Sequence, residues 1–162
     1  MKFEDIIDRC LVAVGVEAET KEDLLMDLVR RVKETYPSID DATLLEALRA
    51  REAEASTGIG NGVAIPHAAV EGLEKPVCVL ARLANPMEFD ALDHQPVHVV
   101  FLLASPLERA SPSGRTLGTK HVRILARLAR LCMNNDFVGR LAATKCDEEF
   151  FQLVRQEDDK YI

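Results

Sequence analysis

Apolar residues recur at helical spacing in several parts of the chain, and this pattern predicts its helices. The sequence Thr-Lys-Glu-Asp at 20–23 resembles a capping box, with Asp in place of the usual Glu, and opens one such stretch. Asp40 and Asp41 lead into a second amphipathic helix, which we expect to end near Arg51 or Glu54. Three further helices are expected over 120–133, over 135–142 and around Phe150, Leu153 and Val154, the last capped between Thr144 and Asp147.

Continuous apolar runs predict the strands. Residues 77–83 and 97–103 are such runs, each preceded by a proline, and they are typical of strands that are covered on both faces. Shorter strands are expected at 63–65 and 11–16. Strands mixed with helices at this length predict an α/β fold, a layered α/β/α domain in which helices flank a small mixed β-sheet. We expect one domain over residues 1–162.

Composition narrows the function classes. The chain has 162 residues, and 20 Lys and Arg against 27 Asp and Glu give a net charge of −7. With 48% hydrophobic residues it is neither a disordered regulator nor a disulfide-stapled miniprotein, and the acidic balance argues against a nucleic-acid binder. No apolar run reaches the ~18 residues of a membrane span, and acidic residues stand where a secretory signal would be basic or apolar. We therefore expect a cytoplasmic protein without membrane insertion.

The cysteines and histidines do not form a metal motif. The four cysteines are far apart, without a CxxC pair, and are interpreted as small reduced core residues. His94 and His98 flank Pro96 at the start of a predicted strand, without the spacing of a ligand pair, and are interpreted as surface and strand-end histidines. We expect neither a metal nor a cofactor.

Residues 56–67, Ser-Thr-Gly-Ile-Gly-Asn-Gly-Val-Ala-Ile-Pro-His, are the most informative stretch. Its glycines permit positive φ angles and close approach to the backbone, and Pro66 fixes φ just before His67. The imidazole is therefore expected at the end of a strand. The stretch lacks the Lys-Ser/Thr of a Walker motif and precedes a strand rather than a helix. Spacing alone leaves open a glycine-rich turn beside an incidental histidine.

His121 is the second histidine of interest. It shares one helical face with Ile124, Leu128 and other apolar residues, so it is expected to point inward from the first turn of a helix. Either it is a core histidine, or it faces a site for phosphate or another anion at the helix N-terminus. The opposite stripe of basic residues is most simply a solvated face: Lys120, Arg123, Arg127 and Arg130. Residues 105–119, rich in Ser, Pro and Gly, are expected to form a long surface loop before His121.

Arg51-Glu52 and residues 56–67 together resemble the phosphorylation-site signature of enzyme IIA domains of the fructose/mannitol/nitrogen class, in the bacterial phosphoenolpyruvate-dependent phosphotransferase system. The resemblance continues through residues 75–77, 89–93, 96–97 and 100–103 to the helix at His121. The sequence departs from the family in its longer loop before His121, in His94 where Gly is usual, and in His98 where Asp is frequent.

The resemblance implies that His67 accepts a phosphoryl group as a tele-phosphohistidine intermediate, with His121 and Arg51 as site partners. A neutral imidazole can attack a phosphohistidine donor, and no metal or nucleotide is needed because the donor is already a phosphoprotein. The glycine-rich segment would act as a phosphate loop that supplies backbone amides at close range. Its residues are Ser56, Thr57, Gly58, Gly60, Asn61 and Gly62.

The partner implied on the donor side is an HPr-type phosphocarrier protein. On the acceptor side, a nitrogen-type IIA protein acts on regulatory targets, whereas a sugar-type IIA component passes phosphate to a IIB cysteine during uptake. The 162 residues contain no IIB domain and no membrane segment, which favours the nitrogen-type regulator. A IIA-like binding domain without phosphorylation is a third class. In the regulator, phosphate on His67 is expected to order the loop over 105–119.

Overall fold

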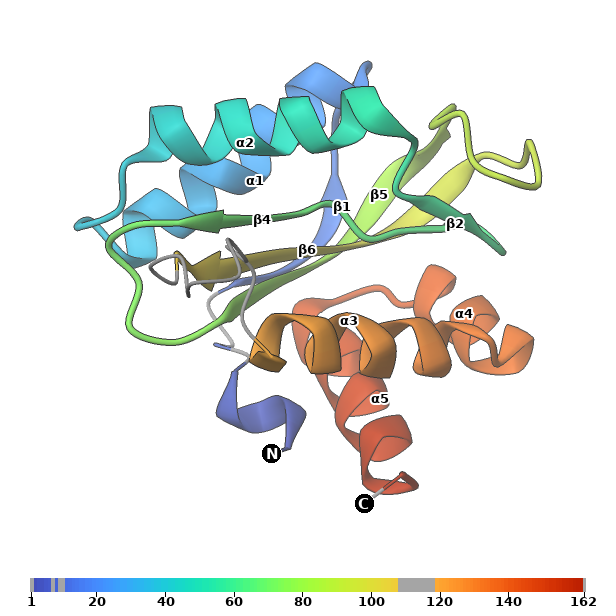
Figure 1. Cartoon of the computed structure of the whole chain (residues 1–162). Coiled ribbons are helices and arrows are strands. Elements are labelled where there is room, and N and C mark those ends of the chain that lie inside the picture. The colour runs from blue at the N-terminus through green and yellow to red at the C-terminus, as the bar shows by residue number, and fades with distance from the viewer. Residues whose placement is uncertain (1, 7, 9–10, 108–118, 162) are drawn as a thin grey trace.

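A mixed sheet forms the middle layer of the molecule (Figure 1). The computed structural model describes residues 2–6, 8, 11–107 and 119–161. The strand order is β1-β5-β6-β3-β2, and β4 also pairs with β6. The strands are β1 Val12–Val16, β2 Gly58–Gly60, β3 Val63–Ala64, β4 His67–Val70, β5 Val77–Met87 and β6 Val97–Pro106. Strands β5 and β6 are antiparallel, whereas β1 is parallel to β5, and β3 and β4 are parallel to β6.

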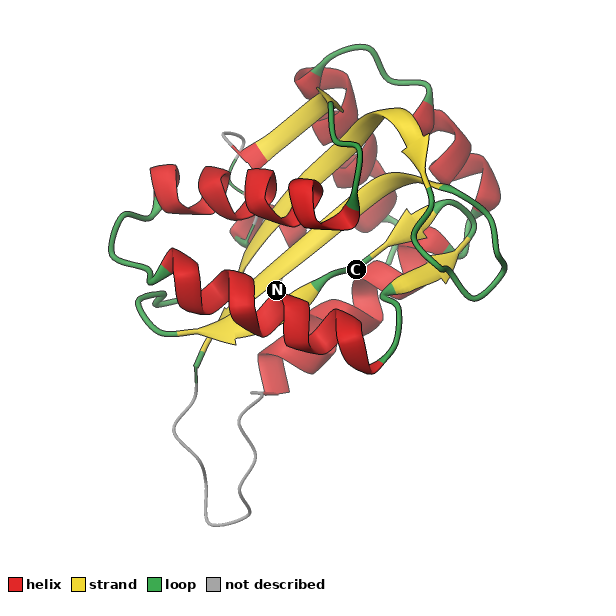
Figure 2. Cartoon of the chain, turned by 90° about the horizontal axis from the view of Figure 1, so that it is seen from above, coloured by secondary structure: helices red, strands yellow, loops and turns green. Residues whose placement is uncertain are grey.

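Helices cover both faces of the sheet. Viewed from above, two helices lie in front of the strands and the others lie behind them (Figure 2). The first layer is α1 Lys21–Thr35 and α2 Asp41–Glu54, and the second is α3 Thr119–Cys132, α4 Asn135–Ala142 and α5 Asp147–Asp159. A short 3₁₀ turn, η1 Phe3–Asp5, packs with the second layer. Each layer encloses its own apolar core, so the expected α/β/α arrangement is confirmed.

The helix starts follow the capping signals of the sequence. The Thr20 hydroxyl oxygen accepts the N–H of Asp23 at 3.1 Å, and an Asp40 carboxylate oxygen accepts that of Thr43 at 3.1 Å. The last helix starts within the expected range, between Thr144 and Asp147, but without a side-chain capping bond. Helix α5 begins after Cys146, whose side chain makes no capping bond, and the Thr144 hydroxyl donates to the Leu141 carbonyl instead.

Both long predicted strands are confirmed, and both extend further than their apolar runs. Ser105 and Pro106 were expected to open a loop, but they continue β6 because Ala69 and Val70 of β4 pair beside them. Leu107 follows the strand, residues 108–118 lie outside the described residues, and Thr119, the last residue of the expected loop, already belongs to α3. Strands β2 and β4 were not predicted, since neither has a long apolar run.

The core on the α3 side holds two thiols. Cys78 on β5 and Cys132 at the end of α3 are buried, which confirms the interpretation for these two, whereas Cys146 is exposed. Burial raises the pKa of Cys132 to about 12 and raises that of Cys78 even further. Cys10 lies outside the described residues.

In the described part of the chain, none of the helices has the length and apolar character needed to cross a membrane.

Candidate functional site

The register of two parallel strands positions the candidate site. His67 pairs with Leu103 and Ala69 with Ser105, where β4 runs beside β6. Alternate residues of a strand share a face, and Leu103 belongs to the core on the α3 side, so His67 and Ser105 both face α3. His121, in the first turn of α3, lies against His67 with the ring centroids 5.4 Å apart and the planes tilted by 57°. The register and α3 thus bring these three side chains together.

A backbone carbonyl fixes the protonation of His67. Its Nδ1 lies 2.8 Å from the carbonyl oxygen of Ile65. A carbonyl oxygen only accepts, so Nδ1 carries the hydrogen and, in the neutral ring, Nε2 keeps its lone pair. Partial burial lowers the pKa of His67, the bond to Ile65 opposes this, and the nearby charge of Arg51 lowers the pKa further. The ring is therefore predominantly neutral at pH 7, with Nε2 as its nucleophilic atom.

His121 is the buried member of the pair, with 1% of its surface exposed. Its Nδ1 lies 2.6 Å from the hydroxyl oxygen of Ser105, and its Nε2 is buried without a hydrogen-bond partner among the described residues. Burial, and secondly the charge of His67, lower the pKa of His121 to about 4. His121 is thus a neutral side chain at pH 7, and its Nε2 is the ring nitrogen that no described residue bonds.

The last turns of α2 place a guanidinium near His67 and a carboxylate against the glycine-rich segment. Helix α2 packs against β4, where Arg51 lies within electrostatic reach of His67 while its Nη1 donates to the Ala55 carbonyl at 2.8 Å. The Glu52 carboxylate accepts the backbone N–H of Thr57 and, at 2.7 Å, its hydroxyl. The Lys21 ammonium lies 3.3 Å from the same carboxylate. Glu52 therefore joins α1, α2 and the glycine-rich segment.

The glycine-rich segment forms a hairpin, β2 to β3, whose tip turns through positive φ angles at Gly60, Asn61 and Gly62. The Asn61 backbone N–H donates to the Asp93 carboxylate at 2.9 Å, and its side-chain amide donates to the Cys132 carbonyl at 3.1 Å. Cys132 ends α3, eleven residues after His121, or roughly 16 Å along a helix. The tip therefore lies toward the end of α3 that is distant from His121.

The base of the hairpin is also bonded within the protein. The Ser56 hydroxyl donates to the Phe89 carbonyl at 2.6 Å and accepts the Gly58 N–H at 3.0 Å. In this structure the backbone N–H groups of Thr57, Gly58 and Asn61 thus have protein acceptors, which are Glu52, Ser56 and Asp93 respectively.

The other two histidines lie outside this cluster. His94 is exposed, and His98 is half-buried at the start of β6, where it packs against Gly62. In the described ranges, no group of His, Cys, Asp and Glu side chains has a metal-binding arrangement.

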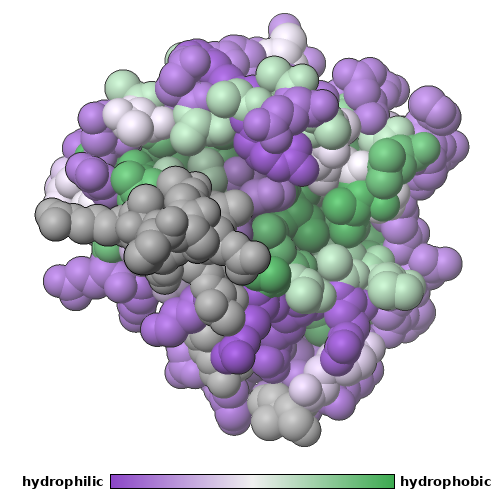
Figure 3. Space-filling model, viewed as in Figure 1, coloured by the Kyte–Doolittle hydropathy of each residue, from purple (hydrophilic) through white to green (hydrophobic). Residues whose placement is uncertain are grey.

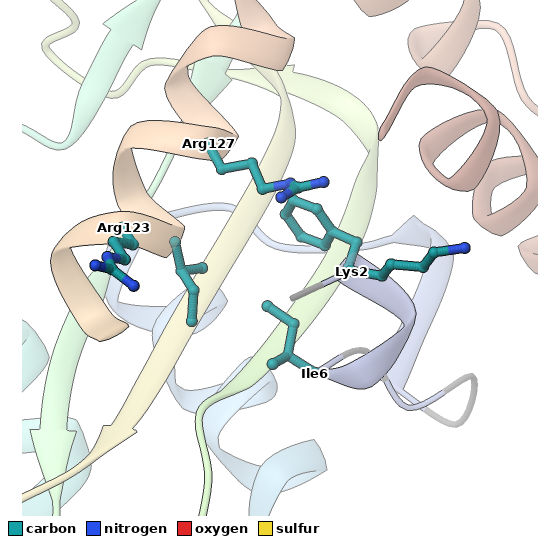
Figure 4. A pocket seen from close by; sticks show the side chains of 6 residues that line it. Lys2, Ile6, Arg123 and Arg127 are labelled. Carbon is teal, nitrogen blue, oxygen red and sulfur yellow. The ribbon is translucent and has the colours of Figure 1, made fainter. Parts of the chain in front are cut away.

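The basic stripe of α3 is not wholly solvated. Arg127 is partly buried, and its Nε donates to the buried carboxylate of Asp158. A pocket of about 140 Å³ lies between α3 and η1, with Phe3, Ile6 and Ile124 as its apolar lining. The charged ends of Lys2 and Arg123 point away on opposite sides of it (Figure 4). Arg127 also lines the pocket, but its guanidinium is bonded to Asp158, so the pocket is an apolar space with basic side chains at its edges.

Ser105 is the site residue that the sequence analysis missed. It falls where the Ser- and Pro-rich stretch begins, so composition assigned it to a loop. The alternation of residues along the strand was the available signal, because Ser105 follows Phe101 and Leu103 at every second position on the α3-facing side of β6.

Comparisons with known proteins point to one family. A family model described as "Phosphoenolpyruvate-dependent sugar phosphotransferase system, EIIA 2" matches residues 5–157. A nitrogen regulatory protein of Pseudomonas aeruginosa is 32% identical over 154 residues, which cover 95% of each chain. A fructose-specific EIIA component of Haloferax volcanii is 32% identical over 131 residues, 81% of this chain and 80% of that protein.

The fold agrees with these relatives. The crystal structure of the nitrogen regulatory protein IIA-Ntr from Neisseria meningitidis superposes with a TM-score of 0.79 at 28% identity. The match covers 93% of this chain and 97% of that one.

Proposed function

Since this chain belongs to the EIIA 2 family of the phosphoenolpyruvate-dependent sugar phosphotransferase system, we propose that it carries a phosphoryl group on Nε2 of His67. The observation that carries the proposal is the bond between His67 Nδ1 and the Ile65 carbonyl, which leaves Nε2 as the nucleophile. The bond from Nε2 to phosphorus forms as the nitrogen–phosphorus bond of a donor phosphohistidine breaks. The electron pair of the broken bond stays on the donor imidazole.

The neighbours of His67 suit a transferring phosphoryl group. Such a group spreads negative charge over its peripheral oxygens, so transfer depends on positioned donors more than on covalent machinery. His121 offers an unpartnered buried ring nitrogen, and Arg51 offers a cationic guanidinium at the end of α2. In this proposal His67 is the phosphoacceptor, and His121 and Arg51 stabilise the charge that develops on the phosphoryl oxygens.

The surface near the site supports docking of a protein donor. Val122, which follows His121 in the first turn of α3, is exposed, and apolar surface extends between the α2 and α3 layers (Figure 3). We propose that an HPr-type phosphocarrier binds there, because an exposed apolar surface next to the nucleophile can be covered by a partner during transfer.

We further propose a regulatory role of the nitrogen type. It is supported by the full-length match to a relative named nitrogen regulatory protein. A phosphoryl group adds roughly −1.5 to −2 charges at pH 7, enough to change which partners the surface binds. The second candidate is a sugar-specific component that passes phosphate to a IIB cysteine, favoured by the fructose-specific relative.

The phosphoacceptor is tested by incubating the chain with phosphoenolpyruvate, enzyme I and an HPr-type carrier, followed by mass spectrometry. The wild type is expected to take up one acid-labile, alkali-stable phosphate, and His67→Ala none. His94→Asn is the matched control, since His94 is exposed and Asn tolerates its positive φ of 59°. Uptake of one phosphate by His67→Ala, or none by the wild type, would overturn the proposal.

The two roles are separated by offering the phosphorylated chain to a purified IIB domain. A regulator is expected to retain its phosphate over many turnovers of a sugar-specific IIA protein run in parallel. Rapid transfer to the IIB cysteine would make the chain a transport component.

A further inference from the structure

We propose that Ser105 is a positioning residue, whose hydroxyl donates to Nδ1 of His121 and so holds His121 in the tautomer with hydrogen on Nε2. The two atoms are 2.6 Å apart, and both side chains are buried. The consequence for phosphoryl transfer rests on the proposed function of His67. The tautomer itself does not, because it belongs to the unphosphorylated chain.

Hydrogen-bond accounting determines the direction of this bond. If Ser105 donates, its hydrogen and the Nδ1 lone pair are both satisfied, and one polar group remains without a partner, the Nε2–H of His121. If His121 donates from Nδ1, then Nε2 remains without a donor and the Ser105 hydrogen without an acceptor, since no other bond of this hydroxyl is found in the described parts of the chain. Each unsatisfied buried group costs free energy, so the first arrangement is favoured.

The tautomer matters because His121 is neutral. Burial disfavours its charged form, and a neutral imidazole carries hydrogen on only one of its two nitrogens. With hydrogen on Nε2, His121 can donate to a phosphoryl oxygen. With hydrogen on Nδ1, it would present a lone pair to that oxygen and repel it. The Ser105 hydroxyl therefore decides whether the second histidine assists or opposes the phosphoryl group.

The fold places Ser105 for this task. Its backbone lies next to Ala69, two residues after His67, so one pair of hydrogen-bonded strands sets the spacing between the phosphoacceptor and the serine. His121 approaches from a different layer, at the first turn of α3. The hydroxyl is thus the link that orients a ring from the helix layer relative to a ring on the sheet.

The first test reads the tautomer in the unphosphorylated full chain, by long-range ¹H–¹⁵N correlation spectra of the histidine rings. The wild type and Ser105→Thr, which keeps the hydroxyl, are expected to show His121 protonated on Nε2. Ser105→Ala is expected to show a mixture or the opposite tautomer. Nδ1 protonation in the wild type, or an unchanged tautomer in Ser105→Ala, would overturn the proposal whether or not the chain is ever phosphorylated.

The second test measures the rate of phosphoryl transfer from an HPr-type carrier to His67. Ser105→Ala is expected to slow the transfer roughly 5- to 10-fold, the size of one hydrogen bond, and Ser105→Thr to restore it. In a His121→Ala background, Ser105→Ala is expected to have no further effect, because Ser105 acts through His121. A full additional loss in that background would show that Ser105 acts by another route.

Thr144→Val is the matched control. Thr144 is also buried and donates one hydroxyl hydrogen bond, at 2.7 Å to the Leu141 carbonyl, but it lies between α4 and α5. Its loss is expected to lower stability and leave both the His121 tautomer and the transfer rate unchanged. A wild type that shows the expected tautomer but accepts no phosphate would refute the function of His67 and not the role of Ser105 toward His121.

Discussion

At the scale of single residues, two identical side chains differ in role because their surroundings differ. His67 is half-buried at the start of a strand, and a carbonyl holds the hydrogen on its Nδ1. His121 is enclosed by α3 and the sheet, and a serine hydroxyl bonds its Nδ1. One ring therefore presents a lone pair from Nε2, and the other is proposed to present a hydrogen. A phosphoryl group between them would need both.

The burial of His121 predicts an acid-dependent loss of stability. Unfolded histidine titrates near 6.5, and the folded pKa is about 4, so between these values the unfolded chain binds a proton that the folded chain does not. The contribution is complete above pH 6.5 and is lost as pH falls to 4. As pH falls over that range, His121 alone should lower the free energy of unfolding by about 3 kcal/mol.

Urea unfolding of the wild type and of His121→Gln at pH 7 and at pH 4 measures this loss. Protonation of carboxylates whose pKa the fold lowers, such as Asp27, also reduces the free energy of unfolding at low pH, but it does so in both proteins. The difference between the two losses is therefore the contribution of His121. Equal losses would contradict a neutral buried His121.

Gly62 illustrates a backbone constraint within the glycine-rich segment. Its φ is +77°, and an added Cβ would lie 2.5 Å from Cδ2 of His98. Gly62→Ala is expected to lower the free energy of unfolding by about 1–3 kcal/mol, from the strained φ and the displaced imidazole. The control is Gly139→Ala in α4, where nothing lies within 4 Å, and which should stabilise by about 0.5–1 kcal/mol. Chemical denaturation of both variants gives the comparison, and an unaffected Gly62→Ala would contradict the packing of His98.

At the scale of elements, the predictable parts were those whose pattern is local. The apolar runs of β5 and β6 and the helical periodicity of α1 and α3 follow from burial of each segment by itself. Strand β4 could not be predicted in this way, because His-Ala-Ala-Val becomes a strand only through its register with β6. The same pairing keeps Ser105 in β6, which local composition assigned to a loop.

The candidate site was likewise predictable only where the signal is local. His67 and His121 could be singled out from sequence, one by its glycine-rich context and one by its place on a helical face. Their contact could not, since it depends on where α3 lies across the sheet. The tip of the glycine hairpin was expected beside the phosphate, but its bond to Cys132 places it toward the other end of α3.

Glu52 is expected to control how α2 meets the glycine-rich segment. Glu52→Ala leaves the backbone N–H and hydroxyl of Thr57 and the ammonium of Lys21 without this acceptor, and should lower the free energy of unfolding by about 1–3 kcal/mol. It should also lower the pKa of His67, which the carboxylate raises. Denaturation and NMR titration of His67 measure the two effects. Glu54→Ala, an exposed position in the same turn, should show neither, and equal behaviour of the two variants would rule out the role of Glu52.

At the scale of the whole molecule, α3 is the element that connects the site to the rest of the fold. Its first turn carries His121, its end accepts the amide of Asn61, and its middle carries Arg127. The Asp158 carboxylate bonds both Arg127 and, at 3.0 Å, the backbone N–H of Phe3. It therefore fastens η1, α3 and α5 together behind the sheet.

Asp158→Asn keeps an acceptor for Phe3 but removes the charge opposite Arg127. The carboxylate side chain is 3% exposed and the guanidinium side chain 27%, so the loss should be about 1–3 kcal/mol, below that of a fully buried pair. Thermal and urea unfolding measure it, with exposed Asp159→Asn as the control. A loss no larger than that of the control would show that apolar contacts, and not this ion pair, stabilise the packing of η1, α3 and α5.

The two buried thiols, Cys78 and Cys132, can report local opening of the folded chain through the rates at which they are modified. A thiol-specific reagent needs an accessible thiolate, so in a Cys10→Ser background Cys146 should be modified at once, and Cys132 and Cys78 only when the protein opens. Cys132 ends the helix that carries His121, whereas Cys78 lies in β5, an interior strand of the sheet. If Cys132 is modified faster than Cys78, α3 detaches while the sheet stays closed, and the ratio of the two rates measures how much more often the α3 side opens.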